Sequence, residues 1–345
     1  MSERIARLRQ RLEEPLLVLA PPNVRYLCGL ESTNAGLLVG PEETRLFTDF
    51  RYAEAARGVE GVVFAETKRN LAVDLAERLS GRIGFEPDAL SYAQYETLAG
   101  GGLELVPRRG LVEGLRALKD EEELDAIRRA SAITTEAYER LTEERFQGRT
   151  ERELAWRLEQ LFHELGADGP AFPSIVASGP NAALPHARPG ERSVQRGDTV
   201  LVDAGAKLDG YCSDCTRTFA AGPLSGELRE AYDACVEGQL AGLEAVRPRV
   251  TGAEADAAAR SAIVEAGFGE AFGHGLGHGV GLLVHEAPRL SAESTDTLAA
   301  TNVVTVEPGV YFPGSGGVRI EDLVVVREEG AEVLTTFTKE LVEVE

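Results

Sequence analysis

Residues 199–214 read TVLVDAGAKLDGYCSD, and this stretch decides the fold of the larger part of the chain. Its pattern predicts two antiparallel strands around a turn centred between Leu208 and Asp209. A symmetric turn would place Asp203 directly opposite Asp214, with Cβ atoms about 5 Å apart. Two ionised carboxylates at that distance repel each other unless a cation lies between them. The pair therefore indicates a metal site, although acids that flank a solvated turn would give the same pattern.

A second pair of acids follows the same logic. Glu307 ends the run VVTVE and Glu321 ends the run GVRIE, and these runs flank a turn centred on Gly314. An acid at the end of such an apolar run is expected to be half buried, and buried carboxylates are usually paired or metal-bound. A salt bridge from Glu321 to Arg319 or to another cation is the competing interpretation.

Three of the five histidines cluster in residues 273–288, GHGLGHGVGLLVHEAP. The alternating glycines exclude a stable helix here and let the backbone approach a site closely. Imidazole binds borderline divalent metals, transfers protons and donates hydrogen bonds to an oxyanion. We therefore expect His274, His278 and His285 to belong to a site. His186, in a loop rich in turn-forming residues, means little alone.

The composition argues against several classes of protein. The chain has 36 Lys and Arg against 57 Asp and Glu, a net charge of −21, which repels nucleic acids and anionic membranes. The longest aliphatic runs have only strand length, so we expect neither a membrane span nor a signal peptide. Four cysteines in 345 residues suggest reduced thiols and a cytoplasmic protein. Cys212 and Cys215 have a CxxC spacing, but strand alternation sends them to opposite faces, which argues against a zinc knuckle.

The length favours two domains. Residues 1–118 alternate short apolar runs with helical patterns, which predicts a small α/β domain. Residues 119–345 open with a charged helix start and contain capping-box patterns at Thr150 and Thr251. Strand-rich stretches follow these helices, so we predict an α+β domain with antiparallel hairpins. All the chemically suggestive residues fall in this second domain.

In order along the chain, these acids and histidines resemble the motifs of the pita-bread metallopeptidases, the family of methionine aminopeptidase, aminopeptidase P and prolidase. The resemblance covers roughly residues 118–345. The first domain is similar to the creatinase-type N-terminal domain of prolidases and aminopeptidases P, and the phrases YLCGL and TDFRY carry that likeness. The resemblance thus implies a pita-bread catalytic domain preceded by a smaller creatinase-like domain.

The resemblance also implies roles for particular residues. Two divalent metal ions, with Mn, Co or Zn as candidates, would be bound by the residues that match the family's ligands: Asp203, Asp214, His278, Glu307 and Glu321. Glu307 would also accept the proton of the attacking water, while His285 and His186 would contact the substrate carbonyl oxygen. His274 would line the substrate side. Arg289 matches an arginine that clamps a dipeptide carboxylate, although neutralisation of Glu286 or of a neighbouring surface acid would explain it equally. Arg319 would orient the acids.

The function that this resemblance implies is hydrolysis of Xaa-Pro bonds in proline-containing peptides by a homodimer, for which the cysteine content suggests a cytoplasmic location. An Xaa-Pro dipeptidase is favoured by Arg289, and an aminopeptidase P acting on longer peptides is the alternative. A methionine aminopeptidase is disfavoured by the first domain. A non-catalytic binding protein or a creatinase-type hydrolase of the same fold would lack ligand positions that are present here.

Overall fold

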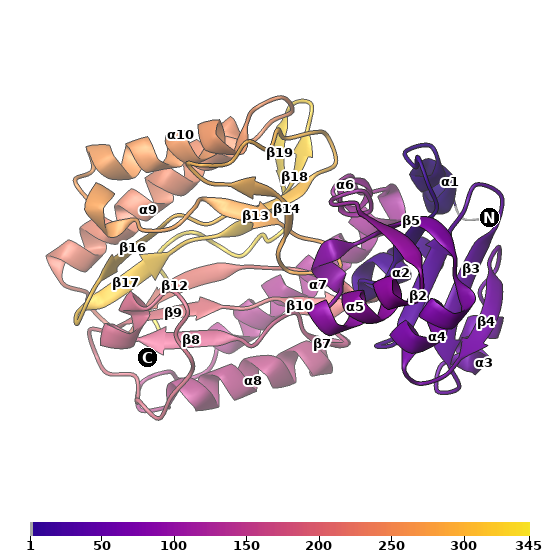
Figure 1. Ribbon diagram of the computed structural model, residues 1–345. Coiled ribbons are helices and arrows are strands. Elements are labelled where there is room, and N and C mark those ends of the chain that lie inside the picture. Colours follow the sequence, from indigo (N-terminus) through magenta and orange to yellow (C-terminus); the bar gives the residue numbers. More distant parts are fainter. Residues whose placement is uncertain (1–2) are drawn as a thin grey trace. The chain divides into compact units, whose positions relative to one another are not determined.

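The computed structural model describes residues 3–345 of the chain. The chain consists of two compact units, residues 1–116 and residues 117–345 (Figure 1). Each unit has its own hydrophobic core. None of the helices among the described residues combines the length and apolarity that a membrane span needs.

The first unit is built on a six-stranded mixed sheet with the order β4-β3-β2-β1-β5-β6. β1 runs parallel to β5 and antiparallel to β2, while β3–β4 and β5–β6 are parallel pairs. A sheet with helices along its sequence agrees with the small α/β domain predicted for this region. The bounds of the strands are β1 (Leu16–Val18), β2 (Ala35–Val39), β3 (Thr44–Asp49), β4 (Val63–Thr67), β5 (Gly81–Phe85) and β6 (Leu103–Pro107).

Helices of the first unit pack on this sheet through apolar faces. Leu75 and Leu98 project from two of them and bury against Leu17 and Phe47 of the sheet. Asn70 caps α4 by accepting a hydrogen bond from the Val73 amide, as its side chain suits an N-cap. The helices are α1 (Glu3–Arg9), α2 (Pro21–Cys28), α3 (Ala53–Arg57), α4 (Leu71–Arg78), α5 (Tyr92–Gly100) and α6 (Glu113–Arg116), with a 3₁₀ turn, η1, at Pro87–Ala89.

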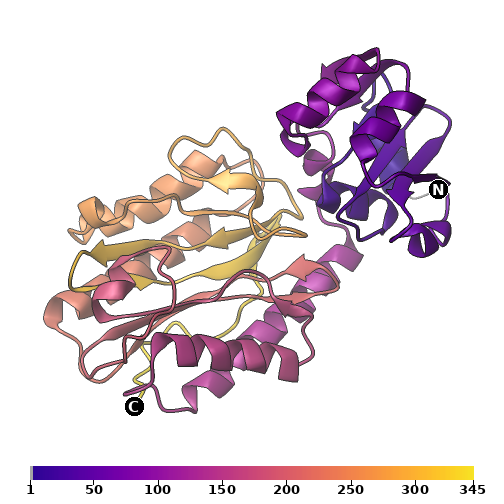
Figure 2. The same ribbon diagram turned by 60° about the horizontal axis from the view of Figure 1, so that its bottom comes forward.

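The second unit begins with two long helices whose starts are marked in the sequence. Asp120, Thr150 and Thr251 each form a complete capping box, which satisfies amides that a helix N-terminus otherwise leaves unpaired. In Figures 1 and 2, α7 and α8 lie along one side of the strands and α9 and α10 along the other. The helices are α7 (Glu121–Thr142), α8 (Glu151–Glu164), α9 (Gly226–Ala245) and α10 (Gly252–Glu265), with 3₁₀ turns η2 (Gly179–Ala183) and η3 (Gly269–Ala271).

The strands of the second unit form small antiparallel sheets, as the α+β prediction requires. Their orders are β11-β10-β7, β12-β9-β8, β14-β13-β15-β18-β19 and β16-β17. The bounds are β7 (Gly169–Pro170), β8 (Ile175–Ser178), β9 (Thr199–Asp203), β10 (Ala206–Leu208), β11 (Tyr211–Cys212), β12 (Thr216–Ala220), β13 (Gly277–Gly279), β14 (Glu286–Leu290), β15 (Val303–Val306), β16 (Gly309–Phe312), β17 (Gly316–Arg319), β18 (Asp322–Arg327) and β19 (Gly330–Val333).

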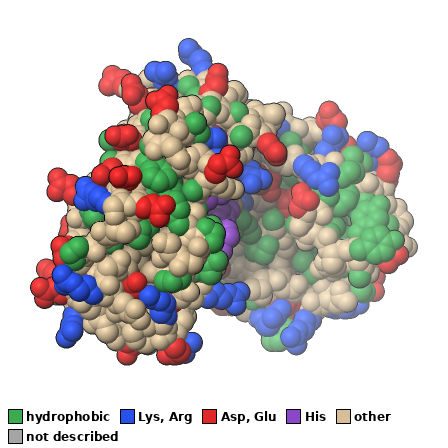
Figure 3. Space-filling view, turned by 90° about the vertical axis from the view of Figure 1, so that its left-hand side faces the viewer, with side chains coloured by type: hydrophobic (Ala, Val, Ile, Leu, Met, Phe, Trp, Pro, Cys, Tyr) green, Lys and Arg blue, Asp and Glu red, His purple; other side chains and the backbone are tan. Residues whose placement is uncertain are grey.

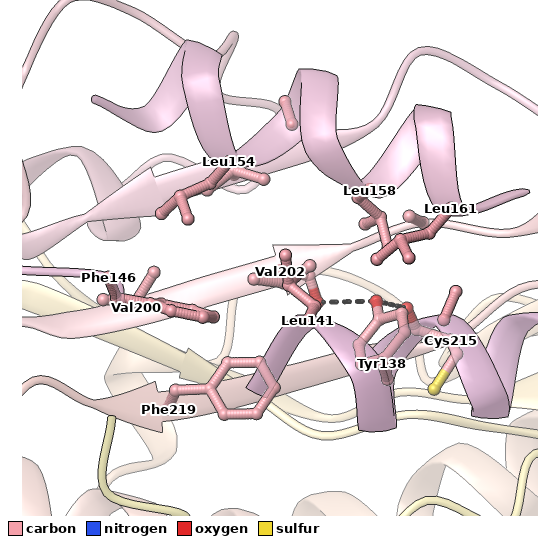
Figure 4. Close-up of a cluster of buried hydrophobic side chains, with 14 of the residues drawn as sticks. Tyr138, Leu141, Phe146, Leu154, Leu158, Leu161, Val200, Val202, Cys215 and Phe219 are labelled. Atoms are coloured by element: carbon pink, nitrogen blue, oxygen red, sulfur yellow. Dashed lines mark hydrogen bonds between the residues drawn. The ribbon is translucent and has the colours of Figure 1, made fainter. Parts of the chain in front are cut away.

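One hydrophobic cluster joins α7 and α8 to the sheet of β8, β9 and β12 (Figure 4). Leu158 and its neighbours on α8 face Val202 of β9, and Phe219 of β12 packs edge-on against Phe146. Full burial of each such side chain contributes about 1.5–3 kcal/mol. The Tyr138 hydroxyl, buried in this cluster, lies 3.1 Å from the Val202 carbonyl oxygen and 2.7 Å from that of Cys215. The cluster therefore fixes α7 to the ends of β9 and β12.

The turn after β9 differs from its predicted position by one residue. Leu208 pairs with Tyr211, so the turn is Asp209-Gly210, and both of its residues have positive φ, 49° and 79°. An Asp-Gly pair suits a two-residue type I′ hairpin turn, and this local preference sets the register. Asp203 consequently pairs with Thr216, and the prediction that it lies directly opposite Asp214 is wrong.

The second acidic hairpin has the predicted register. Gly309 pairs with Arg319 and Phe312 with Gly316, so the turn is centred on Gly314, whose φ is 81°. The same register continues into β15 and β18, where Val306 pairs with Asp322. Glu307 and Glu321 therefore lie opposite each other, between the ladder of β15 and β18 and the ladder of β16 and β17.

Candidate metal centre

Five residues at or near strand ends in the second unit meet in one acidic centre. They are Asp203 at the end of β9, Asp214 between β11 and β12, His278 in β13, Glu307 after β15 and Glu321 between β17 and β18. Strand ends gather here because two sheets exchange hydrogen bonds at this point. The Glu307 amide donates to the Leu276 carbonyl, and the Glu321 amide donates to the Thr216 carbonyl.

Three of the five residues lie at distances that suit ligands for a common cation. Ligand atoms of Asp214, His278 and Glu321 all lie within 4.8 Å of one another. His278 Nε2 lies 3.8 Å from Asp214 Oδ2 and 3.2 Å from Glu307 Oε1. Asp203 is the remaining member: it pairs with Thr216, whose hydroxyl donates to Glu321, and its charge raises the pKa of Asp214.

Three of the four carboxylates hold an oxygen atom that no donor reaches. Asp203 Oδ1, Asp214 Oδ1 and Glu321 Oε1 are buried and make no hydrogen bond within residues 3–345. A buried polar atom without a partner costs about 1–3 kcal/mol, and more when its group is charged. These unpaired acceptors destabilise the folded chain, and only a further donor or a cation would satisfy them.

Electrostatics point the same way. Burial raises the pKa of Asp214 well above its usual range, and the charges of Glu321 and Asp203 raise it further. Burial and then the charge of Glu307 likewise raise the pKa of Glu321. A multivalent cation would remove both penalties, and four carboxylates with one imidazole form a donor set that borderline divalent metals accept. The residues present thus fit divalent metal ions.

Glu307 and His278 behave as a pair within this set. Burial tends to raise the pKa of Glu307, but the hydrogen bond and charge of His278 outweigh it, and the pKa falls to about 2.

The backbone around His278 is glycine for a steric reason. A Cβ at Gly277 would lie 2.1 Å from the Thr305 carbonyl oxygen, and one at Gly279 would lie 2.2 Å from that of Ala287. The alternating glycines thus allow β13 to pass close to its neighbours.

Two threonines hold the acids in place, and the sequence reading did not single them out. Thr216 Oγ1 donates to Glu321 Oε2 at 2.7 Å, and Thr305 Oγ1 donates to Glu307 Oε1 at 3.1 Å. Each threonine is two residues from an acid of the centre along the chain. Because residues i and i+2 of a strand share one face, this spacing was an available signal.

Arg319 lies among the acids, and its side chain is buried. Its Nη2 lies 2.5 Å from Asp203 Oδ2, and its Nη1 donates to the Tyr311 hydroxyl at 2.8 Å. The salt bridge to Glu321, which competed with a metal site, is not formed among the described residues, where Glu321 has no ion pair. Arg319 pairs instead with Asp203 and, at 3.9 Å, with Glu307. It is therefore placed to orient the carboxylates rather than to reach solvent.

The other predicted histidines lie at different depths. His274 is half buried, and its Nε2 forms a hydrogen bond of 2.9 Å with the Tyr311 hydroxyl. His285 is exposed, with its ring centroid 4.2 Å from that of His278. Burial, and then the charges of His278, His186 and Arg289, lower the pKa of His285, so these groups share one neighbourhood. Figure 3 shows histidine side chains reaching the surface beside hydrophobic side chains.

Arg289 in β14 stands directly across from His278 in β13. Its side chain is exposed and has no ion pair within residues 3–345. The competing interpretation, neutralisation of Glu286, is not what the structure contains, because Glu286 pairs with the buried Lys119 at 3.6 Å. Arg289 is therefore available to an anionic ligand beside the acidic centre.

Behind the acids, on the other face of the strands, lies a buried ion pair that the sequence reading also missed. Arg217 Nη2 donates to Asp322 Oδ1 at 2.7 Å. Lys339 and Gln239 contact the other oxygen, at 2.7 Å and 2.9 Å. Arg217 also donates to the carbonyl oxygen of Glu321. The pair thus joins β12 to β18 next to the acidic residues.

The two units match two family models. The model described as metallopeptidase family M24 matches residues 125–328, and the model described as creatinase/prolidase N-terminal domain matches residues 4–118. A relative from Pyrococcus furiosus, named Xaa-Pro dipeptidase, is 35% identical over 349 residues, which cover 99% of this chain and 100% of the relative.

Solved structures agree with these matches. An Xaa-Pro dipeptidase from Bacillus anthracis has 38% identity and a TM-score of 0.95, with 99% of each chain covered. An X-Pro aminopeptidase from Thermotoga maritima has 33% identity and a TM-score of 0.89, with 98% of this chain and 100% of that chain covered. The predicted pita-bread fold with its creatinase-type first domain is confirmed by these likenesses. The chain belongs to the M24 family of metallopeptidases.

Proposed function

We propose that the chain is a metal-dependent exopeptidase that hydrolyses Xaa-Pro bonds, and specifically an Xaa-Pro dipeptidase. The observation that carries the proposal is the set of buried carboxylates, Asp203, Asp214 and Glu321, each with an oxygen that lacks a donor. Similarity to the Xaa-Pro dipeptidases of Pyrococcus furiosus and Bacillus anthracis along the whole chain supports the substrate class.

Two divalent ions per subunit, Mn, Co or Zn, are the proposed cofactor. Asp203 and Asp214 would hold one ion, His278 and Glu307 the other, and Glu321 both. When bound, such a pair supplies a water of lowered pKa and polarises the carbonyl group. The choice of metal depends on its availability, because this donor set accepts several.

The protein's own groups would move the protons and hold the substrate. Glu307 is proposed to accept the water proton and to deliver it to the leaving imino nitrogen, since Thr305 and His278 fix its carboxylate in place. His285 and His186 would donate hydrogen bonds to the carbonyl oxygen as negative charge develops on it. His274, held by Tyr311, would line the substrate side.

Arg289 supports the choice of a dipeptide. Its exposed guanidinium lies across from His278 and has no acidic partner among the described residues, so it suits the C-terminal carboxylate of a short substrate. Proline in the leaving position has no amide N–H, which allows a shaped pocket to discriminate against other peptides. Similarity to the X-Pro aminopeptidase of Thermotoga maritima keeps longer peptides as the second candidate.

The first test compares release of proline from Ala-Pro with removal of alanine from Ala-Pro-Ala, after reconstitution with Mn, Co or Zn. We expect turnover of Ala-Pro and its loss in Asp214→Ala. Asp233→Ala, which removes an exposed carboxylate on α9, is the matched control and should behave as wild type. Preference for Ala-Pro-Ala would identify an aminopeptidase P, and silence on both peptides with every metal would refute the proposed function.

A cytoplasmic homodimer is proposed as the working form. The cysteines of the described chain are all free thiols, which supports a reducing compartment. Sedimentation equilibrium of the metal-loaded protein tests the dimer, and elemental analysis of protein purified without added metal tests the number and kind of ions. A monomer at micromolar concentration would contradict the assembly without affecting the proposed reaction.

A further inference from the structure

Glu151 is a fully buried carboxylate that lies outside the acidic centre. It is the first residue of α8 and is 0% exposed. No cation forms an ion pair with it among residues 3–345. Its oxygens instead accept hydrogen bonds from donors of two other segments: the Ser178 amide (2.8 Å), the Ser178 hydroxyl (2.9 Å), the Asn181 side-chain amide (3.0 and 3.1 Å) and the Gly190 amide (3.1 Å).

These donors stand at the two ends of the loop that carries His186. We call residues 179–192 the His186 loop. Ser178 and Asn181 lie where it begins, and Gly190 lies where it returns. The Glu151 amide also donates to the Arg192 carbonyl at 3.0 Å. A single side chain therefore ties both ends of the His186 loop to the start of α8.

The tip of the loop has few contacts of its own. His186 is exposed, and its imidazole makes no hydrogen bond within the described chain. The backbone near it is held by a turn, in which the Ala187 amide donates to the Leu184 carbonyl, and by Arg319, whose Nη1 donates to the Pro185 carbonyl at 3.4 Å. These contacts hold the backbone of the tip but do not reach the imidazole, whose position relative to His285 therefore also depends on how the base of the loop is held.

The chemistry at the base requires a group that only accepts hydrogen bonds. The Gly190 and Ser178 amides and the Asn181 amide group are donors, and an ionised carboxylate offers acceptors to all of them. A glutamine at 151 would turn an NH₂ group towards one of these donors and leave a buried donor unpaired. The position of Glu151 in the first turn of α8 also stabilises its negative charge.

The start of α8 has a second support that does not involve this carboxylate. Thr150 and Glu153 form the capping box, and Arg192 pairs with Asp198 at 2.6 Å. The fold around α8 is therefore not held by Glu151 alone. The Arg152 amide also donates to the Gly190 carbonyl at 3.1 Å, whereas Asn181 is attached to α8 through the Glu151 carboxylate.

We propose that Glu151 is a positioning residue for the reaction, which holds the His186 loop so that the His186 imidazole stands at the substrate carbonyl. The inference rests on the proposed function, because it assigns Glu151 its effect through His186. The expected result of Glu151→Gln is a fall in kcat/KM on Ala-Pro of about ten- to a hundredfold, the range for residues that orient catalytic groups.

A double-mutant cycle separates this role from a general loss of structure. If Glu151 acts through His186, Glu151→Gln in a His186→Ala background should lower kcat/KM by no more than about twofold, because the two changes are coupled. Equal losses in both backgrounds would overturn the proposal. The matched control is Glu191→Gln, which neutralises a carboxylate of the same loop that is 71% exposed and pairs with Arg152. It should leave kcat/KM unchanged.

Two measurements that do not need turnover complete the test. Calorimetric titration with Mn²⁺ should give the same affinity for Glu151→Gln as for wild type, and hydrogen exchange should be faster in residues 182–190 of the variant. A loss of Mn²⁺ affinity that matches the loss of kcat/KM would overturn the positioning role. If Glu151→Gln fails to fold, Asn181→Ala removes one donor group and should give the same pattern with a smaller effect.

The outcomes for Glu151 and for the proposed function are distinguishable. A wild-type protein that cleaves neither Ala-Pro nor Ala-Pro-Ala would refute the proposed function, whatever Glu151 does. In an active wild-type enzyme, unchanged exchange of residues 182–190 in Glu151→Gln would overturn the inference alone.

Discussion

The acidic centre and the base of the His186 loop both bury carboxylates in the second unit, but they treat the oxygen atoms in opposite ways. At the loop base, both oxygens of Glu151 accept hydrogen bonds from the chain. In the acidic centre, Asp214 and Glu321 are equally buried, yet each keeps one oxygen without a donor in the described chain. A carboxylate whose oxygens are both paired stabilises the fold, whereas a buried carboxylate with an unpaired oxygen can still bind a ligand.

Asp322 sharpens the contrast because it follows Glu321 directly. It is fully buried, and its oxygens contact Arg217, Lys339, Gln239 and Thr335. Adjacent residues of a strand face opposite sides, so one carboxylate turns to the acidic centre and the next to a saturated ion-pair network. Removing one or the other should therefore damage different properties.

The largest expected effect is on catalysis, from Glu321→Gln. We expect kcat/KM on Ala-Pro to fall by about 10³-fold or more, equivalent to about 4 kcal/mol, because the residue contributes to metal binding. Calorimetry should show weaker Mn²⁺ binding in parallel. If Glu321→Gln kept full activity and wild-type Mn²⁺ affinity, a buried acid with an unpaired oxygen would not differ in function from one whose oxygens are both paired.

Asp322→Ala should act on stability. Breaking a buried ion pair leaves Arg217 without its carboxylate and costs about 3 kcal/mol or more in the free energy of unfolding. Urea unfolding in the presence of EDTA measures this cost without a contribution from metal. Asp233→Ala, which breaks an exposed pair with Arg229, should change the stability by less than about 0.5 kcal/mol. Similar losses in the two variants would show that burial does not matter here.

Arg289→Ala tests the exposed cation beside the centre. Loss of a hydrogen-bonded charge pair with a substrate carboxylate should cost about 2 kcal/mol, or about 30-fold in kcat/KM on Ala-Pro. Because Arg289 has no ion pair among the described residues, unfolding in urea should be unaffected. The amide Ala-Pro-NH₂, which lacks the carboxylate, serves as the control substrate, and its turnover should not fall. An equal loss on both substrates would contradict the clamp.

The smallest expected effect is a gain in stability, from Asp214→Asn in the metal-free protein. Because the pKa of Asp214 is raised in the folded state, its ionisation disfavours folding as the pH rises above the usual value of 3.8. A neutral amide removes that penalty, and we expect a gain of about 1 kcal/mol at pH 7.5 in EDTA, absent at pH 3.5. Glu151→Gln should lose stability under the same conditions. A loss of stability in both variants would contradict the interpretation that the acids of the centre keep oxygen atoms without donors for a metal ion.

Much of the fold follows from local patterns. The capping boxes at Thr150 and Thr251 begin helices where predicted, and the hairpin around Gly314 has the predicted register. The first hairpin turns one residue later than symmetry about the two aspartates predicts, at Asp209-Gly210. A two-residue turn requires positive φ at both positions, and that requirement decides the register.

The sequence by itself identified a set of acids and histidines. Their order along the chain resembles the motifs of metallopeptidases. Side chains two residues apart share a strand face, so local periodicity is enough to group Asp214 with Thr216. Only the tertiary structure decided which oxygens stay unmatched and which are saturated. The Glu151 carboxylate receives donors from 27 and 39 residues away, and Glu321 receives its donor from 105 residues away. Contacts at such separations depend on how sheets and loops pack, which no local preference specifies.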